Sequence, residues 1–340
     1  MNWTWSPTQL EALGRHLADL DLCGPTVTAT PIGDGHSNLT YLVGDETRRV
    51  VVRRPPPPPV PAGAHDVVRE ARLLTALSYT PVPVPQVRAV VAAGPIIDVP
   101  LVITEFVDGV VITESTPTPL DQPEIRRQIA EAAVDALAEL HRVDWRALGL
   151  ADFGKPTGFN RRHLLRVSAL VADADGQLPP RFADLADWLD HTRPAESAEA
   201  IVHNDFRLGN LMVAREAPGR IAAVLDWELA TIGDPLFDVG YFLASYPQPG
   251  EPLTPTARMG TAALESGYPK RAELLDRYCG TTGVTPSDIG WYCALAQFKL
   301  AVLYEYGRRR TEVGPEADPY FADPALVESF LQACEQYVRW

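Results

Sequence analysis

The sequence predicts an α+β protein of two domains. Its 340 residues exceed what one small domain needs, and 46% hydrophobic residues supply an ample core. Short β-branched runs are concentrated in the N-terminal third of the chain, whereas apolar residues at helical spacing dominate the rest. We therefore expect a smaller domain that contains most of the strands over 1–107 and a larger, mainly helical domain over 108–340.

An amphipathic helix is predicted to open the first domain. Ser6, Pro7 and Gln9 carry the capping pattern of a helix N-terminus. The opening residues lack the basic and apolar regions of a signal peptide, and no apolar stretch approaches the roughly eighteen residues that indicate a membrane span. The four cysteines are too scattered for a zinc motif or a secreted disulfide framework. We expect a cytoplasmic protein without a membrane segment.

A polar turn with two glycines follows the helix. Gly33 and Gly35 lie in this turn, and residues 39–43 alternate as in a half-buried strand. Glycine lets the backbone approach a phosphate closely, and Ser37 or Asn38 can add hydrogen-bond donors. These four residues are candidates for nucleotide binding, although a plain hairpin turn carries the same pattern.

The next predicted strand, "RRVVVRR", leads through a proline tract into a helix, "AHDVVREARLLTAL". The tract "PPPPPVP" covers 55–61 and is either a stiff connector or a polyproline II ligand for a partner. Its place between a strand and a helix favours the connector.

The remaining elements are one strand and a series of helices. The apolar run "VPLVITE" predicts a strand that ends in a turn near Gly109. Asp121, Pro123 and Glu124 then form the start of a helix. Further helices are predicted over 254–266, 287–310 and 324–339.

Residues 201–240 carry the most specific chemistry in the chain. The polar loop 203–210 is followed by two short apolar runs with Pro and Gly between them, a pattern of loop, strand, turn and strand. Such a hairpin is expected to bring Asn210 close to Asp226, and their oxygens suit a hard cation such as Mg²⁺. Asp205 lies five residues before Asn210, is free to face an incoming hydroxyl, and is the candidate base.

The block "HNDFRLGN … LDWELATIGDPLFDVGYF" resembles the catalytic segment of the aminoglycoside phosphotransferase and choline kinase group, relatives of the protein kinases. Within that group it looks closer to the phosphotransferase domains found beside acyl-CoA dehydrogenase-type enzymes. The resemblance implies a bilobal protein-kinase-like fold, with a small antiparallel β lobe that carries one helix and a larger, mainly helical lobe. It also implies transfer of the γ-phosphate of ATP or GTP to a hydroxyl, with Mg²⁺.

The resemblance also implies roles for single residues. By position, Asp205 would accept or orient the substrate hydroxyl, and Asn210 and Asp226 would hold the metal. Arg207 stands where protein kinases have a lysine that touches the transferred phosphate, which implies a role in the transition state. His203 is expected to brace the loop.

The family's nucleotide clamp uses a strand lysine paired with a helix glutamate. Glu70 is the expected glutamate, but the lysine is absent and Arg53 takes its place, because Val51 then falls on the same strand face, over the adenine. Arg is not a neutral replacement for Lys at such a site. Arg54, on the opposite face, is the alternative.

Three other positions complete the expected nucleotide contacts. The resemblance places Glu105 and Val107 in the hinge between the lobes, with backbone groups toward the adenine, and Met212 on the first strand of the hairpin.

The acceptor is expected to be a small molecule. Only seven residues separate Asp226 from Asp234, whereas protein kinases need a long activation segment to dock a peptide. The acceptor could be an amino sugar or a hydroxylated, for example hydroxyacyl, metabolite. A net charge of −14 argues against nucleic acid as a partner. Asp234 and Asp238 are expected to cap and anchor the helix that follows.

Two other classes of function fit part of the pattern. Arg53 in place of Lys favours a nucleotide-binding pseudokinase that serves as a partner-binding module. A metal-dependent hydrolase would use Asp205 to activate water. Neither explains the glycine-bearing turn and the hinge as well as a kinase does. The sequence carries no signal of oligomeric state.

Overall fold

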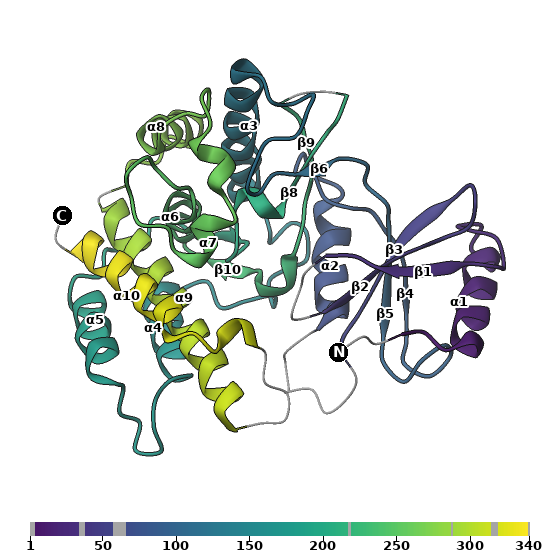
Figure 1. Ribbon diagram of the computed structural model, residues 1–340, viewed down its shortest axis with the longest axis horizontal. Helices are drawn as coiled ribbons and strands as arrows, with labels where there is room; N and C mark the ends of the chain where they lie inside the picture. The colour runs from purple at the N-terminus through teal and green to yellow at the C-terminus, as the bar shows by residue number, and fades with distance from the viewer. Residues whose placement is uncertain are drawn as a thin grey trace. The chain divides into compact units, whose positions relative to one another are not determined.

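The computed structural model describes residues 4–33, 38–56, 66–216, 219–286, 288–313 and 319–338. The chain forms two compact units (Figure 1). The first unit comprises Met1–Asp108 and Ala222–Glu228, and the second comprises Gly109–Ile221 and Leu229–Trp340. An antiparallel sheet in the first and a mainly helical second unit confirm the predicted α+β, bilobal kinase-like fold.

The first unit is built on a five-stranded sheet of order β1-β2-β3-β5-β4, in which neighbouring strands are antiparallel. Two helices accompany it. The elements are α1 (Pro7–Asp19), β1 (Thr28–Pro31), β2 (Leu39–Gly44), β3 (Arg49–Arg54), α2 (Val67–Leu77), β4 (Val87–Val91) and β5 (Leu101–Glu105).

The two sheet faces bury different partners. Leu101 and Ile103 of β5 belong to a core cluster with Leu13 of α1, whereas Val102 between them packs with Val67 of α2. Alternate residues of a strand point to opposite faces, so α1 and α2 cover opposite faces of the sheet. The helix α1 begins with the expected capping box, because Ser6 and Gln9 exchange hydrogen bonds.

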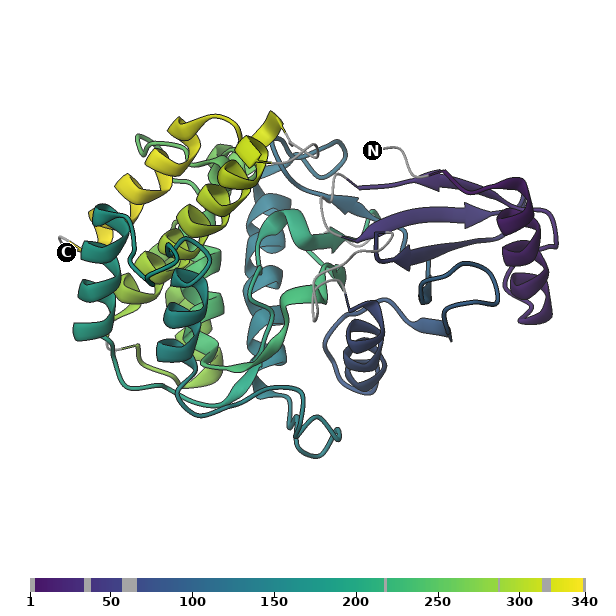
Figure 2. The same ribbon diagram turned by 90° about the horizontal axis from the view of Figure 1, so that it is seen from below.

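Helices dominate the second unit. The longest, α9, packs side by side with α10 and against α6 (Figures 1 and 2). The aromatic side chains of Trp291, Tyr292 and Phe298 on α9 are buried. Of the described helices, none is both long and apolar enough to span a membrane. They are α3 (Pro123–Arg142), α4 (Phe159–Ser168), α5 (Pro180–His191), α6 (Pro235–Ser245), α7 (Pro255–Arg258), α8 (Arg271–Thr282), α9 (Ile289–Val313) and α10 (Pro324–Val338).

One predicted helix is wrong. The range 254–266 holds two short pieces, α7 and a 3-10 turn at Thr261–Leu264, instead of one helix. Gly260 lies between them, and glycine is the weakest helix former after proline.

Short strands frame the polar loop 203–210. The strand β7 (Ala200–Val202) precedes the loop and pairs with β10 (Thr231–Gly233). A 3-10 turn, Leu208–Asn210, ends the loop, and β8 (Leu211–Val213) follows at once and pairs with β6 (Val110–Val111). The strand β9 (Ile221–Val224) comes next in the chain, which confirms the predicted order of loop, strand, turn and strand.

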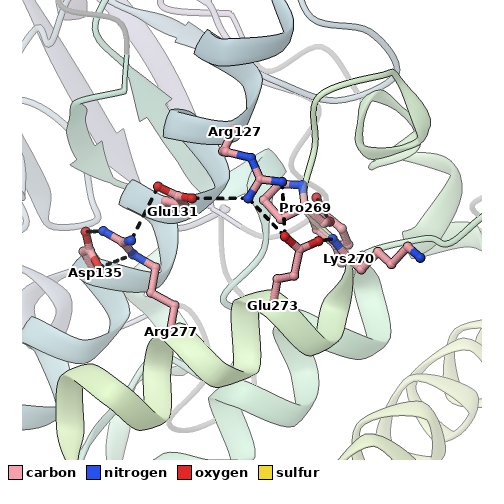
Figure 3. Close-up of polar contacts among 8 residues, drawn as sticks. Arg127, Glu131, Asp135, Pro269, Lys270, Glu273 and Arg277 are labelled. Carbon is pink, nitrogen blue, oxygen red and sulfur yellow. Dashed lines mark hydrogen bonds and ion pairs between the residues drawn. The ribbon is translucent and has the colours of Figure 1, made fainter.

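An ion-pair network joins α3 to α8 on the surface of the second unit (Figure 3). Arg127 binds Glu273 at 3.1 Å and reaches Glu131 at 3.5 Å. Arg277 binds Asp135 at 2.7 Å and Glu131 at 3.4 Å. Glu131 therefore links the two arginines.

Candidate active site

The loop 203–210 is fixed to α6 by a buried carboxylate. The side chain of Asp238 accepts hydrogen bonds from the backbone N–H groups of His203 at 2.6 Å and Asn204 at 2.8 Å. Asp234, one helical turn earlier, caps α6 by accepting from the N–H of Leu236, as predicted. Asp238 anchors α6 by tying it to the backbone of the loop.

Asn204 adopts a left-handed backbone conformation, with φ of 68°. Asn tolerates this region better than most residues. Its side chain donates to the carbonyl of Leu229 at 2.8 Å, and its own carbonyl accepts from Lys299 Nζ at 2.5 Å. The peptide unit before Asp205 is thus held in one orientation.

Asp205 lies in the centre of a set of donors. Its Oδ1 accepts from the Tyr241 hydroxyl at 2.5 Å, and its Oδ2 accepts from Asn210 Nδ2 at 2.8 Å. Its backbone N–H donates to His203 Nδ1 at 3.2 Å, which places the proton of a neutral His203 on Nε2. The histidine therefore braces the loop. The carboxylate of Asp205 is oriented by neutral donors from two elements.

Arg207 lies beside this carboxylate, with its Nε atom 3.7 Å from Asp205 Oδ1. The guanidinium passes directly over Gly209, where an added Cβ would collide with its Nη1 atom. A glycine at 209 is thus needed for the observed position of Arg207.

Arg53 of the first unit binds several carboxylates. Its Nη1 contacts Glu70 Oε1 at 2.7 Å and its Nη2 contacts Asp226 Oδ1 at 2.7 Å. The same Nη2 lies 3.6 Å from Glu228 Oε2, which also accepts from Asn38 Nδ2 at 3.0 Å. The Arg53 guanidinium is therefore shared by Glu70, Asp226 and Glu228.

The charges in this carboxylate cluster are unbalanced. Burial raises the pKa of Glu70, which is 5% exposed, to about 7 in spite of the attraction of Arg53. Burial opposes the charge of Arg53, but Glu70 and Asp226 outweigh it and raise the pKa of the guanidinium. Among the contacts that the structure describes here, three acids face one guanidinium.

The second arginine of β3 lies elsewhere. Arg54 is buried, donates to the Tyr41 hydroxyl at 3.4 Å and lies over the ring of Trp5 at 5.4 Å. It faces the side of the sheet that α1 covers. Of the two arginines considered for the lysine position, Arg53 is the one that pairs with Glu70.

The other predicted nucleotide contacts are distributed along the first unit. Gly33 has φ of 78° and open space where a side chain would be, and half-buried Val51 shares its strand face with Arg53. The N–H of Glu105 donates to the Gln86 carbonyl at 2.9 Å, so a purine contact there would use the carbonyl of Glu105. Val107 is half-buried after β5.

Other predicted positions lie outside these contacts. Gly35, Ser37 and most of the proline tract lie outside the described residues. Met212 is half-buried on β8 of the second unit. Asn210 also belongs to the second unit, whereas Asp226 belongs to the first.

Sequence reasoning missed Tyr241 and Lys299. Tyr241 follows Asp234 by seven residues and Asp238 by three, so helical spacing puts all three on one face of α6. Lys299 stands in the apolar run "CALAQFKLAVL", where a charged residue is unusual. Both signals were present in the sequence.

Comparison with known proteins shows the family. The model described as "Phosphotransferase enzyme family" matches residues 28–274. Acyl-CoA dehydrogenase family member 10 of Mus musculus is 31% identical over 282 residues, which cover 82% of this chain and 26% of that protein. Family member 11 of Homo sapiens is 31% identical over 279 residues, which cover 81% and 35%. The chain thus spans about a third of such relatives, and the predicted likeness to domains beside acyl-CoA dehydrogenases is confirmed.

Solved structures agree with this assignment. A putative aminoglycoside phosphotransferase from Ralstonia eutropha has a TM-score of 0.78 at 29% identity, with 96% of this chain and 98% of that chain covered. An aminoglycoside phosphotransferase in a ternary complex with AMP-PNP and hygromycin B has a TM-score of 0.62 at 15% identity, with 98% of both chains covered, and shares the fold. The chain therefore belongs to the phosphotransferase enzyme family, as its sequence predicted.

Proposed function

We propose that the protein transfers the γ-phosphate of ATP or GTP to a hydroxyl of a small molecule with Mg²⁺. The observation that carries this proposal is the Asp205 carboxylate, which Tyr241 and Asn210 hold in one orientation. A carboxylate fixed in this way can orient a hydroxyl and accept its proton as the phosphate arrives. Arg207 beside it would stabilise charge on the transferred phosphate.

Asn210 and Asp226 are the proposed metal ligands. The amide nitrogen of Asn210 donates to the backbone carbonyl and to Oδ2 of Asp205. The amide oxygen of Asn210, the atom that a hard cation binds, takes no part in these two contacts. Asp226 brings a carboxylate oxygen from a cluster with an excess of acids. Both donors fit Mg²⁺, which when bound would neutralise phosphate charge.

The first unit is proposed as the nucleotide-binding lobe. Arg53 would grip the donor phosphates in place of the usual lysine, with Glu70 as its partner. The backbone of Glu105 and Val107 would face the base. The other proposed contacts are Gly33, Gly35, Ser37, Asn38, Val51 and Met212.

A hollow beside the catalytic loop bears on the acceptor. It is a small depression, partly open to solvent, and lies in the second unit next to Arg207. Its lining includes the apolar surfaces of Phe242, Tyr246 and Met259 and the hydroxyl of Thr256, and no carboxylate belongs to the lining that the structure describes. A polycationic amino sugar would leave its charges unpaired there. We propose a hydroxylated metabolite, such as a hydroxyacyl compound, as the first acceptor to test, and an amino sugar as the alternative.

A transfer assay with labelled ATP and GTP and a panel of hydroxylated acceptors tests the function. Asp205→Ala should lower kcat by about 10²- to 10⁴-fold and leave nucleotide affinity in place. Asp226→Ala should weaken Mg²⁺-dependent nucleotide binding itself. An Asp205→Ala variant with full turnover would contradict the proposed role of the loop carboxylate.

A further inference from the structure

A lysine is buried beneath the catalytic loop. Lys299 of α9 is only 4% exposed, and its Nζ atom donates to the backbone carbonyl of Asn204 at 2.5 Å. It lies over the ring of Tyr241 at 4.8 Å and that of Phe237 at 5.6 Å. Burying an ammonium group is costly, so the contacts of Lys299 must compensate for its lost hydration.

The contact fixes the residue that precedes the candidate base. The N–H of Asn204 is bound by Asp238, its carbonyl by Lys299 and its side chain by the Leu229 carbonyl. With φ of 68°, Asn204 turns the chain sharply at this point. If the carbonyl contact were lost, the peptide unit could rotate and carry Asp205 with it.

Tyr241 connects the same lysine to the carboxylate. One face of its ring receives the ammonium group, and its hydroxyl donates to Asp205 Oδ1 at 2.5 Å. Burial, followed by the charge of Asp205, raises the pKa of Tyr241 well above its usual value, so the hydroxyl stays a donor. Lys299 thus acts on the backbone just before Asp205 and, through Tyr241, on its side chain.

We propose that Lys299 and Tyr241 are positioning residues, which hold the Asp205 carboxylate in its reactive orientation without touching either substrate. The proposal rests on the proposed role of Asp205 toward the acceptor hydroxyl. It adds two residues, from α6 and α9, to the machinery of the reaction.

The charges around Lys299 make its hold on the loop sensitive to pH. Burial lowers the pKa of Lys299 to about 8, while Asp205 and Asp238 oppose this effect and Arg166 adds to it. His163, the other base on α4 that faces Lys299, is itself kept neutral by burial. Above about pH 8 the ammonium group loses its charge and its cation–π contact with Tyr241. Activity should therefore fall on the alkaline side.

Lys299→Met and Tyr241→Phe test the proposal, with Lys270→Met and Tyr268→Phe as matched controls. Lys270 is exposed at the start of α8, and the Tyr268 hydroxyl binds Thr116, away from the loop. We expect kcat to fall by about 100-fold in Lys299→Met and about tenfold in Tyr241→Phe, because small misplacements of a catalytic group are expensive. KM for nucleotide and acceptor should stay unchanged. The alkaline decline near pH 8 should vanish in Lys299→Met and move to higher pH in Lys299→Arg.

Amide hydrogen exchange gives a readout that does not depend on phosphate transfer. The N–H groups of Asn204 and Asp205 should exchange at least tenfold faster in Lys299→Met than in the wild type or in Lys270→Met. If Asp205→Ala proves fully active, the proposed function fails, and this measurement still decides whether Lys299 holds the loop. An unchanged kcat and pH profile in Lys299→Met, or unchanged exchange at Asn204 and Asp205, overturns the proposal.

Discussion

The two units hold their proposed functional carboxylates in opposite ways. In the first unit, Asp226 and Glu70 share one guanidinium, and the cluster carries more negative than positive charge. In the second, Asp205 is held by the neutral donors Tyr241 and Asn210 in a fully hydrogen-bonded setting. An unbalanced cluster is suited to gain a cation, whereas a balanced one is suited to keep a single geometry. This difference predicts that added cations change the stability of the cluster around Arg53. Small displacements of side chains should instead change the activity that depends on Asp205.

Arg53→Met should break the charge arrangement of the first unit and have the largest effect. It removes the guanidinium that contacts Glu70, Asp226 and Glu228, so we expect a loss of about 3–5 kcal/mol in the free energy of unfolding. Mg²⁺ should restore part of the loss, because it can take the place of the missing charge. Urea unfolding with and without Mg²⁺ measures both effects.

The exposed pair of Arg88 and Glu105 on the same sheet supplies the control. Arg88→Met should cost less than about 1 kcal/mol. Equal losses of unfolding free energy in Arg53→Met and Arg88→Met would contradict this prediction, because the buried cluster would then be no more sensitive than an exposed ion pair.

Glu70→Gln sharpens the comparison through pH. The pKa of Glu70 rises from 4.5 in a free side chain to about 7, so the folded protein holds this proton to a higher pH than the unfolded chain. The corresponding stability is fully present below about pH 4.5 and is lost as the pH rises through about 7, with a total of about 3 kcal/mol. Glu70→Gln should remove this loss. Unfolding free energies at pH 4.5, 6 and 8 test it, and parallel pH profiles in variant and wild type would contradict it.

Gly209→Ala probes the second unit by displacement instead of charge. The added methyl group would collide with the Arg207 guanidinium and move it from its place beside Asp205. We expect kcat to fall about tenfold, which corresponds to about 1.4 kcal/mol, with little loss of stability.

The control is Gly280→Ala in α8, where the space around an added Cβ is open. It should leave kcat unchanged and stabilise the fold slightly, since Ala favours a helix over Gly. If Gly209→Ala and Gly280→Ala have the same kcat, the catalytic position of Arg207 does not depend on the glycine at 209.

The smallest effect is expected at the surface network between α3 and α8 (Figure 3). Arg277 and Asp135 are both more than a third exposed, so Arg277→Gln should cost only about 0.5 kcal/mol. The loss should shrink further at high salt because exposed charges are screened. If Arg277→Gln lowers the free energy of unfolding by more than about 2 kcal/mol at high salt, the prediction is wrong, because screened surface charges cannot supply that much.

The sequence predicted what local patterns determine and missed what distant segments supply. The run of β-branched residues in β3 and the loop before β8 follow from neighbours in the chain, and both were found. The contact of Lys299 with Asn204 joins residues 95 apart, and that of Tyr241 with Asp205 joins residues 36 apart. Helical spacing places Tyr241 on the same face of α6 as Asp238, and an apolar run marks Lys299 as unusual, but neither pattern tells which distant residue the side chain contacts. The anchoring role of Asp238 was expected, but its partners were not, because they precede it by more than 30 residues.

The central claim is that this phosphotransferase binds a Mg²⁺-nucleotide through Asp226 and with Arg53 in place of the usual lysine. A thermal-shift titration with ATP and GTP, each with and without Mg²⁺, on the wild type and on Asp226→Asn is its most direct test. A ligand that binds only the folded form adds about 2.7 kcal/mol of stability at a concentration of 100 times its Kd. The account predicts a rise in Tm with Mg²⁺-nucleotide that the wild type shows and Asp226→Asn loses. No rise at millimolar nucleotide, or an equal rise in both proteins, would contradict it.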